Sequence, residues 1–158
     1  MTHLLHKQGN ILDLAEAGEF DIVVQGCNCF NTMGGGLARE IRERYPNVAE
    51  ADLVTIRGDY NKLGNWTAAT AGPSGGRFTI INAYTQYDMS TGEDVFEYIA
   101  FELILQKLLH TYGRKRIGFP YIGMGLAKGD PTTIMLQLEK FATDVHAAGG
   151  SVTLVEFK

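Results

Sequence analysis

The chain has 158 residues, which is enough for one sizeable hydrophobic core and short for two, so we expect a single domain over residues 1–158. Hydrophobic residues make up 45% and charged residues 20% of the sequence, which is typical of globular proteins and excludes the disordered and fibrous classes. The net charge of −4 argues against general binding of nucleic acids.

Strand and helix patterns of hydrophobic residues alternate along the chain. Apolar residues spaced by three and four make 93–110 the clearest helix, and Asp130 followed by Pro131 suits the start of another. In chain order we predict a strand at 4–7, a short helical or irregular segment ending near residue 18, a strand at 20–25, a helix at 37–45, a helical turn or two at 47–53, a hairpin of strands at 65–70 and 77–86, a helix at 93–110, a strand at 116–120, a helix at 131–147 and a strand at 151–157. This order predicts an α/β fold with a mixed central sheet.

A glycine-rich loop, residues 25–36, joins the buried strand at 20–25 to the helix at 37–45. Its three consecutive glycines, Gly34, Gly35 and Gly36, let the backbone approach a ligand closely, and the helix that follows presents free N–H groups. The loop has neither the G-x-G-x-x-G spacing of dinucleotide-binding proteins nor the Gly-Lys-Ser/Thr of a P-loop. Glycine clusters also occur in ordinary loops, but Asn28 and Asn31 add polar groups at the strand end. We therefore expect a functional loop that binds a phosphate or pyrophosphate.

A second glycine-rich loop, residues 121–130, also lies between a strand and a helix. Two opposed loops of this kind could hold the two phosphates of a pyrophosphate from both sides. The segment 82–86 adds polar residues at the end of a strand between the loops, although Tyr84 and Tyr87 each fit a half-buried strand surface more simply than a ligand contact.

Cys27 and Cys29 are the two cysteines, and the four histidines provide no second pair at zinc-finger spacing. A disulfide between residues so close in sequence would be strained, so we expect buried free thiols, no metal and no cofactor. No apolar run approaches the roughly 20 residues that cross a bilayer, and the N-terminus lacks the features of a signal peptide. We therefore expect no membrane partner and a cytoplasmic location.

These segments, in this order, resemble a macrodomain over essentially the whole chain. The similarity is greatest to the small macrodomains of phages and bacteria that include ADP-ribose-1″-phosphate phosphatases. The resemblance implies a three-layer α/β/α domain that binds the small molecule ADP-ribose in a crevice, and we expect a monomer. It also implies that the first glycine loop lies against the distal ribose and the second against the diphosphate.

The resemblance further assigns roles to single residues. Asn10 stands where many macrodomains have an aspartate that accepts a hydrogen bond from the adenine amino group, although a turn asparagine bonded to its own backbone is an equal alternative. Asn28 matches a position near the distal ribose. Asp130 matches an acidic residue that could activate a water molecule, unless it only caps its helix. The implied catalytic residues are Asp130 and Asn28, and the implied ligand-binding residues are Asn10, Ile11, Gln25, Asn31, Met33, Gly34, Gly35, Gly36, Leu37, Tyr84, Ile122, Gly123, Met124, Gly125, Leu126 and Lys128.

Two departures from the family pattern bear on activity. Gln25 replaces a histidine common in close relatives, and Pro131 replaces an aromatic residue after the aspartate. Glutamine cannot act as an acid or a base near neutral pH, so these changes question hydrolysis more than ligand binding. We rank a phosphatase of ADP-ribose-1″-phosphate or a related ADP-ribosyl hydrolase first, and a binding module without turnover second. An unrelated Rossmann-like nucleotide binder comes third.

Overall fold

The computed structural model describes residues 2–33, 35–88, 94–124 and 128–158. Gly34, Gly125 and Leu126, which the resemblance assigns to the site, lie outside the described residues, as does the expected start of a helix at residue 93. Six strands form one sheet in the order β1-β6-β5-β2-β4-β3. The elements are β1 (Leu4–Gln8), α1 (Ile11–Glu16), β2 (Ile22–Cys27), α2 (Gly36–Arg44), α3 (Pro46–Leu53), the 3₁₀ helix η1 (Tyr60–Lys62), β3 (Trp66–Ala71), β4 (Phe78–Tyr84), α4 (Tyr98–Tyr112), β5 (Arg116–Phe119), α5 (Pro131–Ala148) and β6 (Ser151–Glu156).

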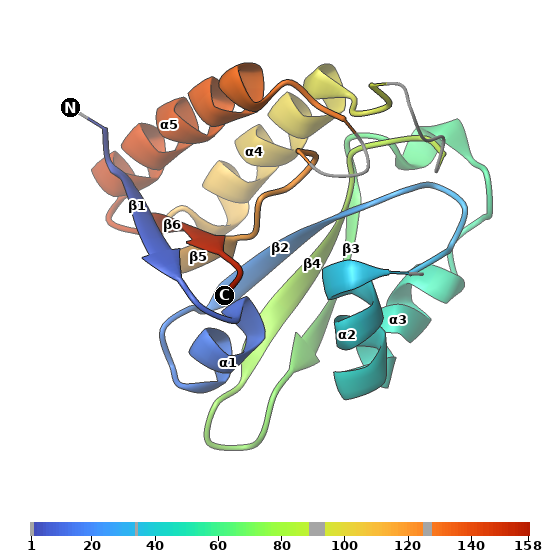
Figure 1. Ribbon diagram of the computed structural model, residues 1–158, viewed down its shortest axis with the longest axis horizontal. Coiled ribbons are helices and arrows are strands. Elements are labelled where there is room, and N and C mark those ends of the chain that lie inside the picture. The colour runs from blue at the N-terminus through green and yellow to red at the C-terminus, as the bar shows by residue number, and fades with distance from the viewer. Residues whose placement is uncertain (1, 34, 89–93, 125–127) are drawn as a thin grey trace.

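The sheet is mixed, as the sequence predicts. In the order of the sheet, the neighbouring strands β1, β6, β5, β2 and β4 are all parallel. The last strand, β3, pairs antiparallel with β4 in the predicted hairpin. Parallel strands place their carboxyl ends at one edge of the sheet, so the loops after β2 and β5 emerge on the same side (Figure 1).

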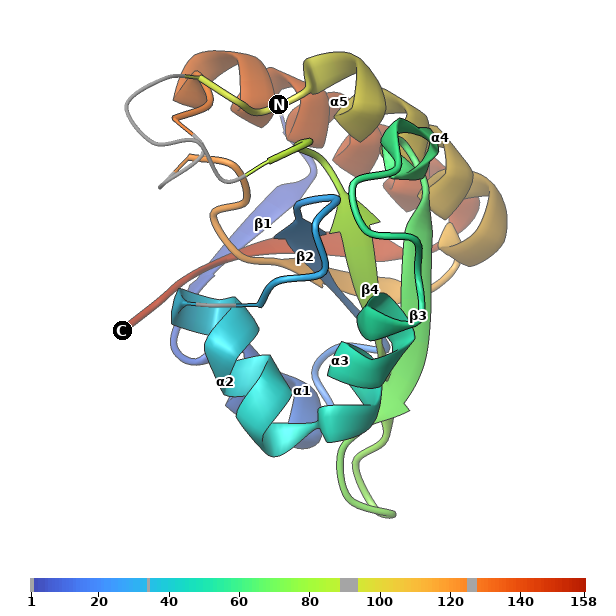
Figure 2. The same ribbon diagram turned by 90° about the vertical axis from the view of Figure 1, so that its right-hand side faces the viewer.

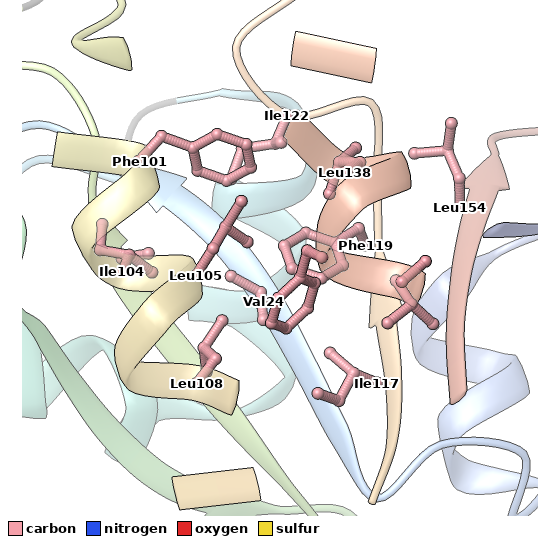
Figure 3. Close-up of a cluster of buried hydrophobic side chains, with 14 of the residues drawn as sticks. Val24, Phe101, Ile104, Leu105, Leu108, Ile117, Phe119, Ile122, Leu138 and Leu154 are labelled. Atoms are coloured by element: carbon pink, nitrogen blue, oxygen red, sulfur yellow. The ribbon is translucent and has the colours of Figure 1, made fainter. Parts of the chain in front are cut away.

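Helices cover both faces of the sheet and make three layers, which confirms the expected α/β/α architecture. Figure 2 shows α4 and α5 on one face and α1, α2 and α3 on the other. The face toward α4 and α5 holds the larger apolar core, in which residues such as Phe101, Leu108 and Phe119 are inaccessible to solvent (Figure 3). Among the described residues, no helix is long and apolar enough to span a membrane.

Several predicted boundaries differ from the structure, and backbone pairing explains two of the differences. Strand β2 runs two residues past the predicted end, because Gly26 and Cys27 continue the ladder with β4. Helix α4 begins at Tyr98, since Phe96 is engaged in an antiparallel bridge with Gln86 and is therefore extended. Hydrophobic spacing alone does not distinguish such a packed extended segment from a first helical turn.

Candidate ligand-binding site

One cavity lies at the carboxyl ends of β2, β4 and β5, between the two glycine-rich loops. Its volume is about 260 Å³. We call it the loop cavity, and its lining residues are Gln25, Gly26, Gly35, Leu37, Ala38, Thr85, Gln86, Pro120, Tyr121, Ile122 and Gly123. This is the position at which open α/β sheets bind ligands.

A second cavity, of about 410 Å³, adjoins the first. We call it the apolar cavity, because most of its wall is hydrocarbon, and its lining residues are Gly9, Asn10, Ile11, Gly36, Leu37, Glu40, Pro120, Val155 and Phe157. Leu37 and Pro120 line both cavities. The two cavities therefore form one crevice with an apolar end and a more polar end.

The N-terminus of α2 lies at the junction of the two cavities. Its N-cap residue is Gly35, and no side chain in the described part of the chain caps the helix. The first backbone N–H groups of a helix have no partner within the helix, and the helix dipole makes this end positive. Gly35, Leu37 and Ala38 line the loop cavity, so an anion there would meet this helix end.

The floor of the loop cavity is buried and polar. Thr85 is only 1% exposed, and its hydroxyl has no hydrogen-bond partner among the described residues. A Cβ atom on Gly26 would lie 2.9 Å from the Thr85 hydroxyl oxygen and from the Ile122 side chain, so glycine is required for this close packing. A buried hydroxyl without a partner is rare in folded proteins, and a ligand or a water molecule in the cavity would satisfy it.

A buried lysine holds the first glycine-rich loop in place through hydrogen bonds. Lys62 is 7% exposed, and its Nζ donates to Asn31 Oδ1 at 2.6 Å and to Thr55 Oγ1 at 2.8 Å. Asn31 also donates to the backbone carbonyl of Thr55 at 2.8 Å and has a left-handed φ of 58°. These bonds tie the loop to the segment that follows α3.

No profile of a known protein family matches the chain. An uncharacterized 17.5 kDa protein from the tk-vs intergenic region of Enterobacteria phage T4 is 33% identical over 129 residues, which covers 78% of this chain and 79% of the phage protein. The macrodomain of Mycobacterium tuberculosis DarG superposes with a TM-score of 0.68 at 20% identity, over 98% of this chain and 97% of that one. A Trypanosoma brucei macrodomain in complex with ADP-ribose gives a TM-score of 0.68 at 15% identity, over 98% of this chain and 63% of that one.

The chain belongs to the same family as the phage T4 protein, and its fold is that of a macrodomain. The predicted macrodomain fold is thereby confirmed, and the crevice lies between the two glycine-rich loops of this chain.

The resemblance implies a set of site residues, and eight of those that the structure describes line the crevice. Five of the others, Asn28, Asn31, Met33, Tyr84 and Met124, are buried or half-buried and do not line it, while Lys128 and Asp130 are exposed beyond it. The eight that line it are Asn10, Ile11, Gln25, Gly35, Gly36, Leu37, Ile122 and Gly123.

Asn28 and Tyr84 are engaged in internal hydrogen bonds. The Asn28 amide donates to Thr32 Oγ1 at 2.8 Å, and its oxygen accepts from the backbone N–H of Phe30, so the side chain shapes its own loop. Tyr84 is 1% exposed, and its hydroxyl donates to Asp52 Oδ1 at 2.7 Å on the side of the sheet that faces α3.

Asn10 caps helix α1, which is the alternative that the sequence left open. Its Oδ1 accepts from the backbone N–H groups of Leu12 and Asp13 at 2.9 and 3.1 Å. Its amide group donates to Glu40 Oε1 at 3.0 Å. Both lone pairs of the Asn10 oxygen are thus used within the protein, while the residue still lines the apolar cavity.

Asp130 caps α5 as predicted. Its Oδ1 accepts from the backbone N–H of Thr132 at 3.3 Å, and its Oδ2 accepts from the Thr133 hydroxyl at 2.7 Å. The bond from the Thr133 hydroxyl lowers the pKa of Asp130. The carboxylate is exposed, and each oxygen retains one lone pair for water or a ligand.

The two cysteines are free and buried, as expected. Burial raises the pKa of Cys29 to about 11 and that of Cys27 further, so both stay as thiols near neutral pH and neither is a ready nucleophile. Over the described ranges, no group of three or more His, Cys, Asp or Glu residues could hold a metal ion.

The sequence did not assign several lining residues to the site, among them Glu40, Thr85, Pro120 and Phe157. Glu40 lies one helical turn after Gly36, so the i, i+4 spacing could have placed both on one side of α2. Thr85 lies in the segment 82–86, which the sequence marked as polar residues at a strand end, and it directly follows β4 in the structure. No sequence signal marks Phe157, which reaches the crevice only because β6 lies between β1 and β5.

Proposed function

We propose that this protein binds ADP-ribose, with the adenine in the apolar cavity and the distal ribose in the loop cavity. The diphosphate then lies at the N-terminus of α2, at the end of the first glycine-rich loop, and not against the second loop as the resemblance implies. The observation that carries the proposal is the junction of the two cavities at Leu37 and Pro120, beside an uncapped helix end. A flat apolar base and an anionic pyrophosphate need these two environments side by side. The likeness to the Trypanosoma brucei macrodomain, which is in complex with ADP-ribose, supports it.

The walls of the apolar cavity suit a base. Ile11, Leu37 and Val155 supply aliphatic surface, and the ring of Phe157 is 76% exposed at the cavity. Burying such apolar surface against a base is favourable, and an exposed phenyl ring offers a face for stacking. In the loop cavity, the buried Thr85 hydroxyl offers a hydrogen bond to the distal end of the ligand.

We propose further that the protein hydrolyses ADP-ribose-1″-phosphate or a related ADP-ribosyl substrate, with Asp130 as the general base. A carboxylate with a lowered pKa stays ionised and can accept the proton of an attacking water molecule. In the phosphatase reaction, water oxygen bonds to phosphorus, the bond from phosphorus to the ribose oxygen breaks, and that oxygen takes up a proton. The products are ADP-ribose and inorganic phosphate.

A binding module without turnover is the alternative, and the position of Gln25 favours it. Gln25 is 2% exposed, and its amide donates to Asn82 Oδ1 at 2.8 Å, so the side chain offers no proton to a leaving group. A hydrolase acting on a modified protein or nucleic acid would use the same crevice with the modified macromolecule beyond the distal ribose. Activity assays on these substrates separate the three possibilities.

Calorimetric titration with ADP-ribose tests binding, with AMP, ATP and NAD as comparison ligands. Gly35→Glu should abolish binding, because the new carboxylate would lie at the helix end that the diphosphate needs. The fold should tolerate it, since a Cβ on Gly35 meets no atom within 4 Å. Gly75→Glu is the matched control, because Gly75 has the same free space and does not line the crevice. Equal binding of ADP-ribose by both variants would contradict the proposed site.

Asp130→Asn tests turnover separately from binding. The variant keeps an oxygen for the helix cap, so the dissociation constant for ADP-ribose should change little, whereas phosphate release should fall by about 10²–10⁴-fold. Asp144→Asn, on the exposed side of the same helix, is the control and should retain full activity. Unchanged release in Asp130→Asn would leave Asp130 as a cap alone, and no release by the parent protein would favour the binding module.

A further inference from the structure

Glu40 is the one acidic residue among the described residues that line the apolar cavity. Glu40, on α2, lines the cavity together with hydrocarbon side chains and Asn10. Its side chain is 33% exposed, so it is partly withdrawn from solvent at the cavity wall. A base that enters this cavity therefore meets one negatively charged group and few other polar atoms.

The two oxygens of Glu40 have different surroundings. Oε1 accepts from the Asn10 amide at 3.0 Å and from Arg44 Nη1 at 2.9 Å. Oε2 has no hydrogen-bond partner in the part of the chain that the structure describes. Two donors thus fix the carboxylate group through one oxygen, and the other oxygen is left to accept from a ligand.

Asn10 cannot take that role itself. Its oxygen already accepts two backbone N–H groups as the N-cap of α1, and its amide nitrogen can only donate. The residue acts instead on Glu40, because its amide bond orients the carboxylate. The acceptor in this cavity is therefore on α2 and not at the start of α1.

We infer that Glu40 selects the base of the bound nucleotide by accepting one hydrogen bond from its exocyclic amino group through Oε2. The inference rests on the proposed function and names the group that makes it specific for adenine. Hypoxanthine carries a carbonyl oxygen in place of the amino group, and that oxygen would face the carboxylate without a proton between them. Guanine binds carboxylates best through two N–H groups and two oxygens, and here only one oxygen is free.

Competition between ligand analogues tests the inference on the unmodified protein. ADP-ribose should bind at least about tenfold more tightly than its hypoxanthine or guanine analogue, because a buried acceptor left without its donor is costly. Equal affinities would overturn the role of Glu40 while leaving ADP-ribose binding intact. Failure of all three ligands to bind would instead overturn the proposed function.

Glu40→Gln makes the test specific to this residue. The glutamine oxygen can keep the bonds from Asn10 and Arg44, which places its amide N–H groups where Oε2 was. The ratio of the affinity for ADP-ribose to the affinity for the hypoxanthine analogue should then fall by about tenfold or more, since the carbonyl of the analogue can accept a hydrogen bond from the glutamine amide. A purely structural role for Glu40 would weaken both ligands equally and leave their ratio unchanged.

Glu43→Gln is the matched control. Glu43 lies three residues further along α2, is exposed and pairs with Arg39. It does not line the apolar cavity, so this variant should keep the parent ratio of affinities. A similar shift of the ratio in Glu43→Gln would mean that the charge of the helix, and not a contact of Glu40, sets the preference, and would overturn the inference.

Discussion

The two faces of the sheet differ in the chemistry of their side chains. Toward α4 and α5, β2 and β4 present aliphatic residues, among them Ile22, Val24, Ile81 and Ala83. Toward α2 and α3, the alternate positions of the same two strands begin as apolar residues and become polar at their carboxyl ends. One face is therefore a uniform apolar core and the other is divided.

A chain of hydrogen bonds fills the polar part of the second face. The Gln25 amide donates to Asn82, which in turn donates to Thr67 Oγ1 at 3.1 Å. The Thr67 hydroxyl lies 3.0 Å from the hydroxyl of Tyr84, which donates to Asp52. Gln25, at one end, lines the loop cavity.

The two faces of the sheet therefore contribute differently to the stability of the fold and to the ligand-binding site. Apolar packing stabilises without regard to direction, whereas a fully satisfied polar network fixes the orientation of each member. The network lies beneath the first glycine-rich loop, where the position of the backbone matters for a ligand. We therefore expect changes on the two faces to separate in their effects on stability and on binding.

The largest effect on stability should come from the apolar face. Leu108→Ala removes a side chain that is inaccessible to solvent and should lower the free energy of unfolding by about 2–5 kcal/mol, from lost burial and the cavity left behind (Figure 3). The ADP-ribose affinity of the folded protein should not change. Leu103→Ala on the same helix, where the side chain is 46% exposed, is the control for denaturant unfolding and should cost much less.

A substitution on the polar face should change both the free energy of unfolding and the affinity for ADP-ribose. Asn82→Leu removes the acceptor of the Gln25 amide and a donor to the carbonyl of Val48, and should cost about 2–3 kcal/mol of unfolding free energy. Because Gln25 lines the loop cavity, ADP-ribose should also bind more weakly. Ile80→Val, on the same strand and the same side, should cost about 0.5–1.5 kcal/mol with unchanged affinity. If Asn82→Leu also left the affinity unchanged, the contrast between the faces would concern stability alone.

The sequence predicted the parts of this arrangement that depend on neighbouring residues. The strand before the first glycine-rich loop, the helix after it and the cap at Asp130 all follow from local spacing and residue type, as does the order of the elements along the chain. Lys62 could not be predicted as a buried anchor, because its partners Asn31 and Thr55 meet it only through tertiary packing.

The division of roles between Asn10 and Glu40 was also beyond the sequence. A capping asparagine and a ligand-binding asparagine have the same local signature, and the choice depends on hydrogen bonds to Leu12 and Asp13. The bond to Glu40 spans 30 positions in the sequence. The helical pattern of α2 places that glutamate on the same side as Gly36, but only the packing of α1 beside α2 makes that side the wall of a cavity.

A change at the floor of the loop cavity should move stability and binding in opposite directions. Thr85→Val keeps the shape of the side chain and removes a buried hydroxyl without a partner, so the free energy of unfolding should rise by about 1 kcal/mol. ADP-ribose should bind more weakly, because the ligand loses a hydrogen bond. Thr85→Ser, which keeps the hydroxyl, should retain the affinity. A loss of stability in Thr85→Val would indicate that the hydroxyl is already satisfied in the free protein.

The smallest effect should come from an exposed ion pair at the opposite end of the strands, away from the polar network. Asp21 precedes β2 and accepts from the backbone N–H, Nε and Nη2 of Arg116 at 2.9, 3.1 and 2.9 Å. These bonds lower the pKa of Asp21 in the folded state. Both side chains are more than a third exposed, at 37% and 51%, so solvent screens their interaction.

The lowered pKa determines the sign of the pH dependence. Near pH 3 to 4 the unfolded chain binds more protons at Asp21 than the folded protein does, so this group adds stability as the pH rises. Asp21→Asn should therefore cost less than about 1 kcal/mol above roughly pH 5, with the difference from the parent shrinking as the pH falls below about 4. Urea unfolding at a series of pH values measures this difference. A cost that stayed constant down to the lowest pH would mean that Asp21 acts by its shape and hydrogen bonds and not by its charge, in contrast to the ion pair that the geometry indicates.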